Sequence, residues 1–178
     1  MTHYVSPPEK VIPWLCYEES LTEKLKKTTG DASIQVLGYG LQRPHSWEKR
    51  VLGIQEPLEF IREIVMYSHE ARCWYARTIA PESTYQIHPD FFARLEKNAL
   101  HVMLFQEELA VRKSMHCYGV GKKELEFSWV KRFVSPLDMN LSENNLPLWV
   151  RRCCFLIGGK EPFYLVEIFL PQFWDLIT

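Results

Sequence analysis

The stretch from Pro147 to Pro171 constrains the fold of this chain most, because it is typical of a β-hairpin inside a sheet. Two runs rich in aromatic and branched residues flank Gly158-Gly159-Lys160-Glu161-Pro162, where glycine can take positive φ and proline ends a ladder. Successive side chains of the second run point to opposite faces, and both faces are apolar. The pattern therefore predicts a central strand that is covered on both sides.

One carboxylate, Glu167, falls on a face of this strand that otherwise carries Phe163, Leu165 and Phe169. A buried acid must be paired, hydrogen-bonded or protonated, because an isolated charge is costly to remove from water. Glu167 can form an ion pair with Arg151 or Arg152 across the hairpin, or it can be a catalytic carboxylate. The residues alone leave both interpretations open.

A second buried charge is predicted at Arg62, in the segment Leu58 to Tyr67. Branched residues and the following Ser68-His69-Glu70-Ala71 turn favour a strand, although ten residues also allow a helix. As a strand, the segment places Arg62 on an apolar face. Cys73 to Ala80 then completes a hairpin.

Two predicted helix starts offer free backbone amides. Ser20-Leu21-Thr22-Glu23 matches a capping box for a helix that ends at Gly30, so the amides near Leu21 form an anion site or simply begin a surface helix. Asn98 can cap a further turn and leaves free amides near Leu100.

The remaining segments complete an α+β fold: a single, mainly antiparallel β-sheet flanked by helices, because no βαβ rhythm is present. Further elements are expected as helices at 11–17 and 89–98, strands at 32–42, 109–117 and 126–134, and loops at 43–57 and 135–147.

Composition excludes several classes of protein. The 178 residues suit one domain, 1–178, and the net charge of −1 gives no basic field for nucleic acid or an anionic membrane. No signal-peptide pattern or membrane span is expected, so we predict a cytoplasmic protein. A monomer is expected as well, although no sequence feature bears on the oligomeric state. Five cysteines without CxxC and six scattered histidines predict no metal site, and no phosphate loop or GxGxxG is present.

The two buried charges and the two helix starts suit a small, flat anion with a polar group at its far end. Arg62 would clamp a carboxylate, amides near Leu21 and Leu100 would share it, and Glu167 would meet the opposite polar edge.

At these positions the sequence resembles the chorismate pyruvate-lyase family. The matching motifs cover most of the chain in the family's order: Trp14-Leu15-x-x-Glu18-x-Ser20-Leu21-Thr22, Ile61-Arg62-Glu63-Ile64, Ala76-Arg77-Thr78-Ile79-x-Pro81-x-Ser83-Thr84, Leu95-x-Lys97-x-x-Leu100-x-x-x-Leu104-Phe105, Leu148-Trp149-x-Arg151-Arg152 and Glu167-Ile168-Phe169-Leu170-Pro171.

The resemblance implies a closed internal ligand pocket, no cofactor, and elimination of pyruvate from chorismate to give 4-hydroxybenzoate, the first committed step of ubiquinone biosynthesis in bacteria. It implies that Arg62 and the backbone at Leu21 and Leu100 bind the ring carboxylate, and that Glu167 faces the ring hydroxyl as a general acid or base. Arg77 is expected to attract the second carboxylate, or to form an ion pair on the sheet surface.

Two features depart from the family pattern. His101 stands where the family usually has glycine, which predicts a narrower pocket mouth or a displaced amide. The segment from about 112 to 145 has no match and is interpreted as an insertion.

An alternative function is a non-catalytic aromatic-acid-binding domain, such as the effector domain of a transcription regulator, although no helix-turn-helix is expected beside the fold. A third is an interaction protein acting through the insertion.

Overall fold

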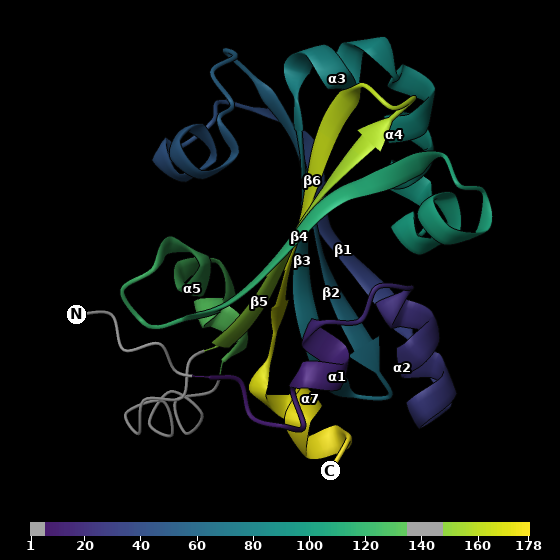
Figure 1. The fold of residues 1–178 in the computed structure, drawn as a ribbon, viewed down its shortest axis with the longest axis vertical. Helices are drawn as coiled ribbons and strands as arrows, with labels where there is room; N and C mark the ends of the chain where they lie inside the picture. Colours follow the sequence, from purple (N-terminus) through teal and green to yellow (C-terminus); the bar gives the residue numbers. More distant parts are fainter. Residues whose placement is uncertain (1–5, 135–147) are drawn as a thin grey trace.

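The computed structural model describes residues 6–134 and 148–178, and a six-stranded antiparallel sheet lies at its centre. The strand order is β1-β2-β3-β6-β5-β4, and the sheet is strongly twisted (Figure 1). The strands are β1 (Ser33–Gln42), β2 (Glu59–Ser68), β3 (Ala71–Pro81), β4 (Ala110–Val120), β5 (Leu148–Ile157) and β6 (Glu161–Phe169). The predicted α+β class with a single antiparallel sheet is confirmed.

Short helices surround the sheet. They are α1 (Ile12–Leu15), α2 (Leu21–Thr29), α3 (Glu82–Ile87), α4 (Pro89–Lys97), α5 (Leu125–Val130) and α7 (Pro171–Leu176), with π-helical turns η1 (Glu48–Leu52) and η2 (Val102–Gln106) and a 3₁₀ turn η3 (Lys131–Phe133). In Figure 1, α3 and α4 lie near one end of the twisted sheet, and α1, α2 and α7 lie near the other. Within the described ranges, no helix has the length and apolar character that crossing a membrane requires.

The β5–β6 hairpin is confirmed as the centre of the sheet. The chain turns at Gly158 and Gly159, whose φ angles are 59° and 75°; residues with a Cβ atom rarely adopt such positive values. β6 pairs with β3 on its other edge, so both of its neighbours are strands. Its alternating side chains enter two different cores, as expected for a strand covered on both faces.

A hydrophobic core lies on each face of the sheet, so the side chains of the central strands point alternately into one core and the other. The larger core lies under α1, α2, α4 and η2, and it receives Phe60 and Phe163 from the sheet. The smaller core lies on the opposite face, where Trp47, Tyr75 and Val130 are buried. Because side chains along a strand alternate between the two faces, charged residues can be in contact only if they point to the same face of the sheet.

Two predicted segments differ in the structure. The expected loop at 43–57 contains η1, which buries Trp47, and the expected strand at 126–134 is α5 followed by η3. In that second segment Glu126, Phe127 and Val130 are buried, and their spacing of three and four residues is that of a helix. The segment 58–67 is a strand, which excludes the helical alternative.

The segment interpreted as an insertion begins inside the sheet. Residues 112–120 belong to β4, which pairs with β5 along its length, and residues 125–133 form α5 and η3. Residues 135–147, which comprise the predicted loop and the end of that segment, lie outside the described residues. That 1–178 form one domain, and that about 112–145 are an insertion, stay predictions.

Candidate functional site

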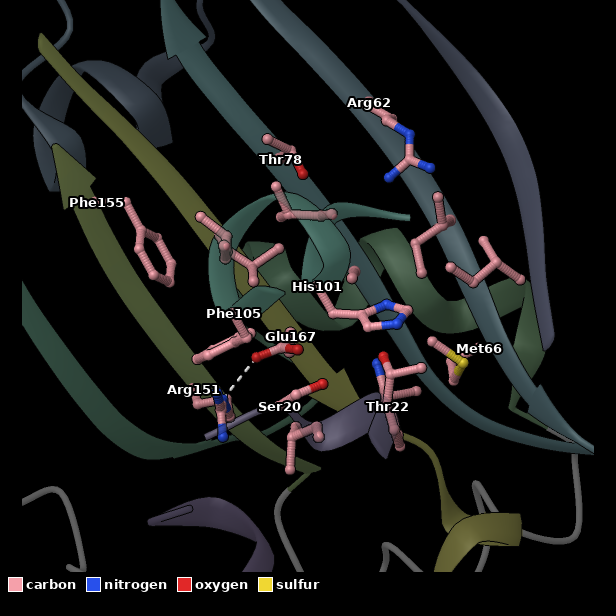
Figure 2. A pocket seen from close by; sticks show the side chains of 18 of the residues that line it. Ser20, Thr22, Arg62, Met66, Thr78, His101, Phe105, Arg151, Phe155 and Glu167 are labelled. Atoms are coloured by element: carbon pink, nitrogen blue, oxygen red, sulfur yellow. Dashed lines mark ion pairs between the residues drawn. The ribbon is translucent and has the colours of Figure 1, made fainter. Parts of the chain in front are cut away.

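A cavity lies between the larger-core face of the sheet and the segments that contain α2 and η2. Its empty space, open mouth included, is about 570 Å³, of which about 60 Å³ can hold the centre of a water-sized sphere. Figure 2 shows side chains from β2, β3, β5 and β6 converging on it, with His101 and Thr22 from the covering segments.

Arg62 projects from β2 into this cavity and is only 4% exposed. Its Nη2 donates a hydrogen bond to the carbonyl oxygen of Asn98 at 3.3 Å, while its buried Nε finds no acceptor among the described residues. Burial lowers the pKa of Arg62, and no carboxylate pairs with it in the described part of the chain. The site therefore contains a cation with unused donors.

Glu167 enters the same cavity from β6 and is 7% exposed. Its Oε2 lies 2.6 Å from Nε of Arg151, its register partner on β5, and Nη1 of Arg151 donates to the carbonyl oxygen of Tyr17 at 2.8 Å. The expected pair across the hairpin is therefore present with Arg151. The neighbouring Arg152 lies over the ring of Tyr118 on the other face.

The ion pair with Arg151 does not remove Glu167 from the cavity, since both residues line it (Figure 2). Glu167 is thus a buried and charge-compensated carboxylate that faces open space. The structural and the catalytic interpretations are compatible.

The two predicted helix starts also meet at the cavity. The Glu23 amide donates to Oγ of Ser20 at 3.2 Å, and Leu21 and Thr22 line the cavity just inside this cap. The first N–H groups of a helix have no partner within it, so they are available to a ligand. Leu100, at the second start, lines the cavity as well.

The reciprocal half of the predicted capping box is absent. No hydrogen bond joins the Glu23 side chain to the Ser20 amide in the described chain; instead Oε1 of Glu23 lies 3.4 Å from Nε2 of His101. The His101 ring is itself part of the cavity wall, beside Glu167 and Thr22 in Figure 2. Sequence reasoning noticed this residue but did not identify its partner.

The structure does not bring Arg77 to this cavity. Strand alternation directs Ala76 and Thr78 of β3 into it, and Arg77 to the opposite face. There its Nη2 lies 3.4 Å from Oε1 of Glu48, and the guanidinium stacks over the Trp129 ring at 4.5 Å. The expected contact between Arg77 and a second carboxylate does not fit this position; the alternative, an ion pair, does, although the pair is buried.

Arg112 is the cavity residue that the sequence reasoning missed, because it was assigned to the start of an insertion. On β4 it pairs in register with Phe155 of β5, beside a bulge between Arg112 and Ser114. Its Nη1 donates to the carbonyl oxygen of Glu18 at 2.5 Å, and its Nε and Nη2 have no acceptor among the described residues. The alternating pattern of 109–117 was the signal that could have placed it.

The cavity is consequently cationic. Three arginines and one glutamate line it, together with apolar side chains such as Phe155 and Leu165. Within residues 6–134 and 148–178, no cluster of three or more His, Cys, Asp or Glu side chains could hold a metal ion. The arrangement suits a small, partly apolar molecule that carries more than one negative charge.

Comparison with curated proteins finds relatives that are named chorismate pyruvate-lyase or probable chorismate pyruvate-lyase. The chain is 26% identical over 172 residues to a "Probable chorismate pyruvate-lyase" of Aromatoleum aromaticum, covering 96% of this chain and 90% of the relative. A relative of the same name in Idiomarina loihiensis is 30% identical, with 93% and 83% covered. The "Chorismate pyruvate-lyase" of Pectobacterium carotovorum is 25% identical, with 93% and 79% covered.

Solved structures share the fold at low sequence identity. PhnF from Mycobacterium smegmatis matches with a TM-score of 0.54 at 13% identity, over 91% of this chain and 67% of PhnF. A GntR-family transcriptional regulator from Bacillus cereus matches with a TM-score of 0.53 at 12% identity, over 79% and 92% of the two chains.

The family model described as "Chorismate lyase" matches residues 2–178, nearly the whole sequence. The cavity that this sequence encloses, with Arg62 and Glu167 buried in its wall, therefore lies in a protein that belongs to the chorismate lyase family.

Proposed function

We propose that this protein is a chorismate pyruvate-lyase that converts chorismate to 4-hydroxybenzoate and pyruvate, and that it supplies the first committed step of ubiquinone biosynthesis. The observation that supports this most is the burial of Arg62 and Glu167 in one cavity with no ion pair between them among the described residues. The names of the curated relatives point to the same reaction.

Chorismate is a dianion, and the cavity offers a cation for each carboxylate. The ring carboxylate binds Arg62 and the amides near Leu21 and Leu100. The carboxylate of the enolpyruvyl group binds Arg112, whose Nε and Nη2 lack acceptors in the described chain, and this contact replaces the one expected from Arg77. Guanidinium groups favour such bidentate contacts.

The reaction breaks the ether bond at ring carbon C3 and removes the hydrogen at C4. The ring becomes aromatic, and the departing enolpyruvate takes up a proton to give pyruvate, so atoms and charge balance without a cofactor. Glu167, positioned by its ion pair with Arg151, accepts the C4 proton or orients the C4 hydroxyl. The other groups contribute positioning and charge stabilisation.

The test is to incubate purified protein with chorismate and to measure 4-hydroxybenzoate and pyruvate together. We expect the two products in equal amounts, at a rate that Glu167→Gln lowers sharply while the variant remains folded. No release of either product, or a folded Glu167→Gln variant with normal turnover, would contradict the proposal.

A second candidate is a binding domain without turnover. The fold is shared with a GntR-family regulator, which at 12% identity supports the architecture alone. Binding of 4-hydroxybenzoate without release of pyruvate from chorismate would favour this function.

A further inference from the structure

His101, in the wall of the cavity, combines a buried polar atom with a neighbouring carboxylate, that of Glu23. Its ring lines the cavity, Nε2 lies 3.4 Å from Oε1 of Glu23, and the buried Nδ1 has no hydrogen-bond partner among the described residues. A buried polar atom without a partner is costly, about 1–3 kcal/mol. The described residues provide neither a donor nor an acceptor for Nδ1, so this atom is available to a ligand in the cavity.

The position of His101 identifies which part of a ligand it would meet. Arg62 is tied to the carbonyl oxygen of Asn98, three residues before His101, and Leu100 lines the cavity between them. The segment whose carbonyl oxygen binds Arg62 therefore also carries His101, and in the view of Figure 2 the His101 ring lies below Arg62 and beside Glu167 and Thr22. A ring carboxylate that Arg62 and the amide near Leu100 hold, as the proposed function has it, would be close to His101.

The contact with Glu23 fixes the tautomer of the free ring. A carboxylate only accepts hydrogen bonds, so a neutral ring must carry its proton on Nε2, which leaves a lone pair on Nδ1. Burial lowers the pKa of His101, which Glu23 partly opposes, so the ring of the free protein is neutral near pH 7. A lone pair on Nδ1 would repel a carboxylate, whereas a protonated ring would donate to it.

The charged groups around the ring come from every element packed against the cavity. They are Glu23 and Lys26 on α2, Arg62 on β2, Arg112 on β4, Arg151 on β5 and Glu167 on β6. Arginines remain charged at any working pH, and Glu167 is compensated by Arg151. His101 is thus the side chain of the cavity wall whose charge can respond to a ligand.

We propose that His101 is a specificity-determining ligand of the cavity, which takes up a proton when an aromatic carboxylate binds and donates that proton from Nδ1 to the carboxylate while Glu23 holds Nε2. This rests on the proposed function for the nature of the ligand, but it does not require turnover. It predicts selection for an anionic group at the end of the ring next to Arg62.

Calorimetry of 4-hydroxybenzoate binding, in two buffers of different ionisation enthalpy, measures the protons exchanged. We expect uptake of between about half and one proton per molecule bound at pH 7, and a Kd that rises by up to about tenfold per pH unit above neutrality. The neutral isostere 4-hydroxybenzamide should bind without uptake, because its amide group can donate to the neutral ring.

Two variants assign the proton. His101→Gln keeps a donor for Glu23 but cannot titrate, so uptake should vanish and Kd should become independent of pH. His88→Gln is a matched control, because His88 forms a similar pair with Glu161 at 3.2 Å and does not line the cavity. Uptake should persist in this control.

The outcomes separate this inference from the lyase activity. Binding of 4-hydroxybenzoate without proton uptake, or uptake that survives in His101→Gln, overturns the role of His101 and leaves the lyase reaction standing. Proton-coupled binding in a protein that releases no pyruvate supports His101 and overturns the lyase reaction. Failure of every aromatic carboxylate to bind overturns both.

Discussion

Arg62 and Glu167 reach the same cavity from β2 and β6, with β3 between them and their positions offset by two residues along the strands. Arg62 pairs with Thr78, while Glu167 pairs with Ala76 on the same strand. Two strand spacings and two residue rises place their Cα atoms about 12 Å apart. The sheet itself therefore keeps opposite charges separated, and the space between them can hold a ring.

Because of this separation, Glu167 does not neutralise Arg62, and the guanidinium of Arg62 can bind an anionic ligand. Replacing Arg62 by Met should weaken binding of 4-hydroxybenzoate about 10- to 100-fold, because a charge-assisted contact is worth about 1.5–3 kcal/mol. The same change should raise the free energy of unfolding by about 1 kcal/mol or more, since a buried charge without a carboxylate partner is replaced by hydrocarbon. Calorimetry and urea unfolding measure the two effects.

The test depends on Arg62→Met weakening the binding of 4-hydroxybenzoate while increasing the stability of the fold. A variant that loses binding and stability together would show that Arg62 is a structural residue whose guanidinium holds the segment at Asn98 in place. Unchanged binding would remove Arg62 from the site.

Arg112 should distinguish a dianion from a monoanion. Arg112→Gln should raise the KM for chorismate at least about tenfold, because it removes a contact to the second carboxylate, and should change the Kd of 4-hydroxybenzoate by less than about twofold. Steady-state kinetics and calorimetry on the same variant give the comparison. Equal losses for both molecules would place Arg112 in the packing of the cavity wall, where it lies over Phe105 and Phe155.

The sequence predicted the parts of the site that depend on strand alternation and helix capping. Arg62 and Glu167 each occupy a charged position in an apolar face of period 2, and Ser20 stands at the N-cap of α2, so local patterns were sufficient. The same alternation, read along 73–80, puts Tyr75, Arg77 and Ile79 on one side of β3. It could not show that this side faces away from the cavity, because that depends on how the strands pair.

The contacts that sequence could not supply are long-range. Glu23 meets His101 and Arg112 meets the Glu18 carbonyl only because the sheet brings α2, η2 and β4 together. The helical turns at 46–52 and 125–133 were missed for a local reason: each is short, and its buried residues cover less than two helical turns. Such segments carry too few repeats for a period to be read.

Arg151 and Arg152 are adjacent arginines whose removal should have very different costs. Arg151→Met should lower the free energy of unfolding by about 3–5 kcal/mol, because it leaves the Glu167 carboxylate buried without its partner. Arg152→Met, on the opposite face and half-buried, should cost less than about 1 kcal/mol. Chemical denaturation of both variants tests this.

A double variant isolates the pair. Adding Glu167→Gln to Arg151→Met should recover much of the lost stability, since the buried charge is then neutralised. Equal costs for the two single arginine variants would contradict the finding that Glu167 depends on Arg151.

Glu167→Gln alone should separate chemistry from binding. A glutamine cannot take a proton from ring carbon C4, so kcat should fall by at least about 100-fold, the lower end of typical general acid–base contributions. The Kd of 4-hydroxybenzoate should change less than about tenfold, because Arg62 and the amides near Leu21 and Leu100 remain. Progress curves for pyruvate release and calorimetry measure the two quantities, and a parallel loss of both would assign Glu167 to binding alone.

A second buried carboxylate, away from the cavity, should govern the pH dependence of stability. Glu59 is fully buried on β2; its Oε1 accepts from Nε2 of Gln42 at 3.3 Å, and its Oε2 has no partner in the described part of the chain. Burial, and then the negative charge of Glu48, raise the pKa of Glu59 to about 7. The nearby Arg77 guanidinium is already paired with Glu48.

A carboxyl whose pKa is raised in the folded state binds its proton more tightly there than in the unfolded chain. Its contribution is fully present below the unfolded pKa of about 4.3 and is lost as pH rises to about 7. Glu59→Gln should therefore be as stable as the wild type near pH 4 and more stable at pH 8, by up to about 3 kcal/mol. Urea unfolding from pH 4 to 8 measures the difference. Glu70→Gln, at an exposed turn position, should leave the pH profile unchanged, and a Glu59→Gln variant that parallels the wild type at every pH would show that Glu59 is ionised throughout.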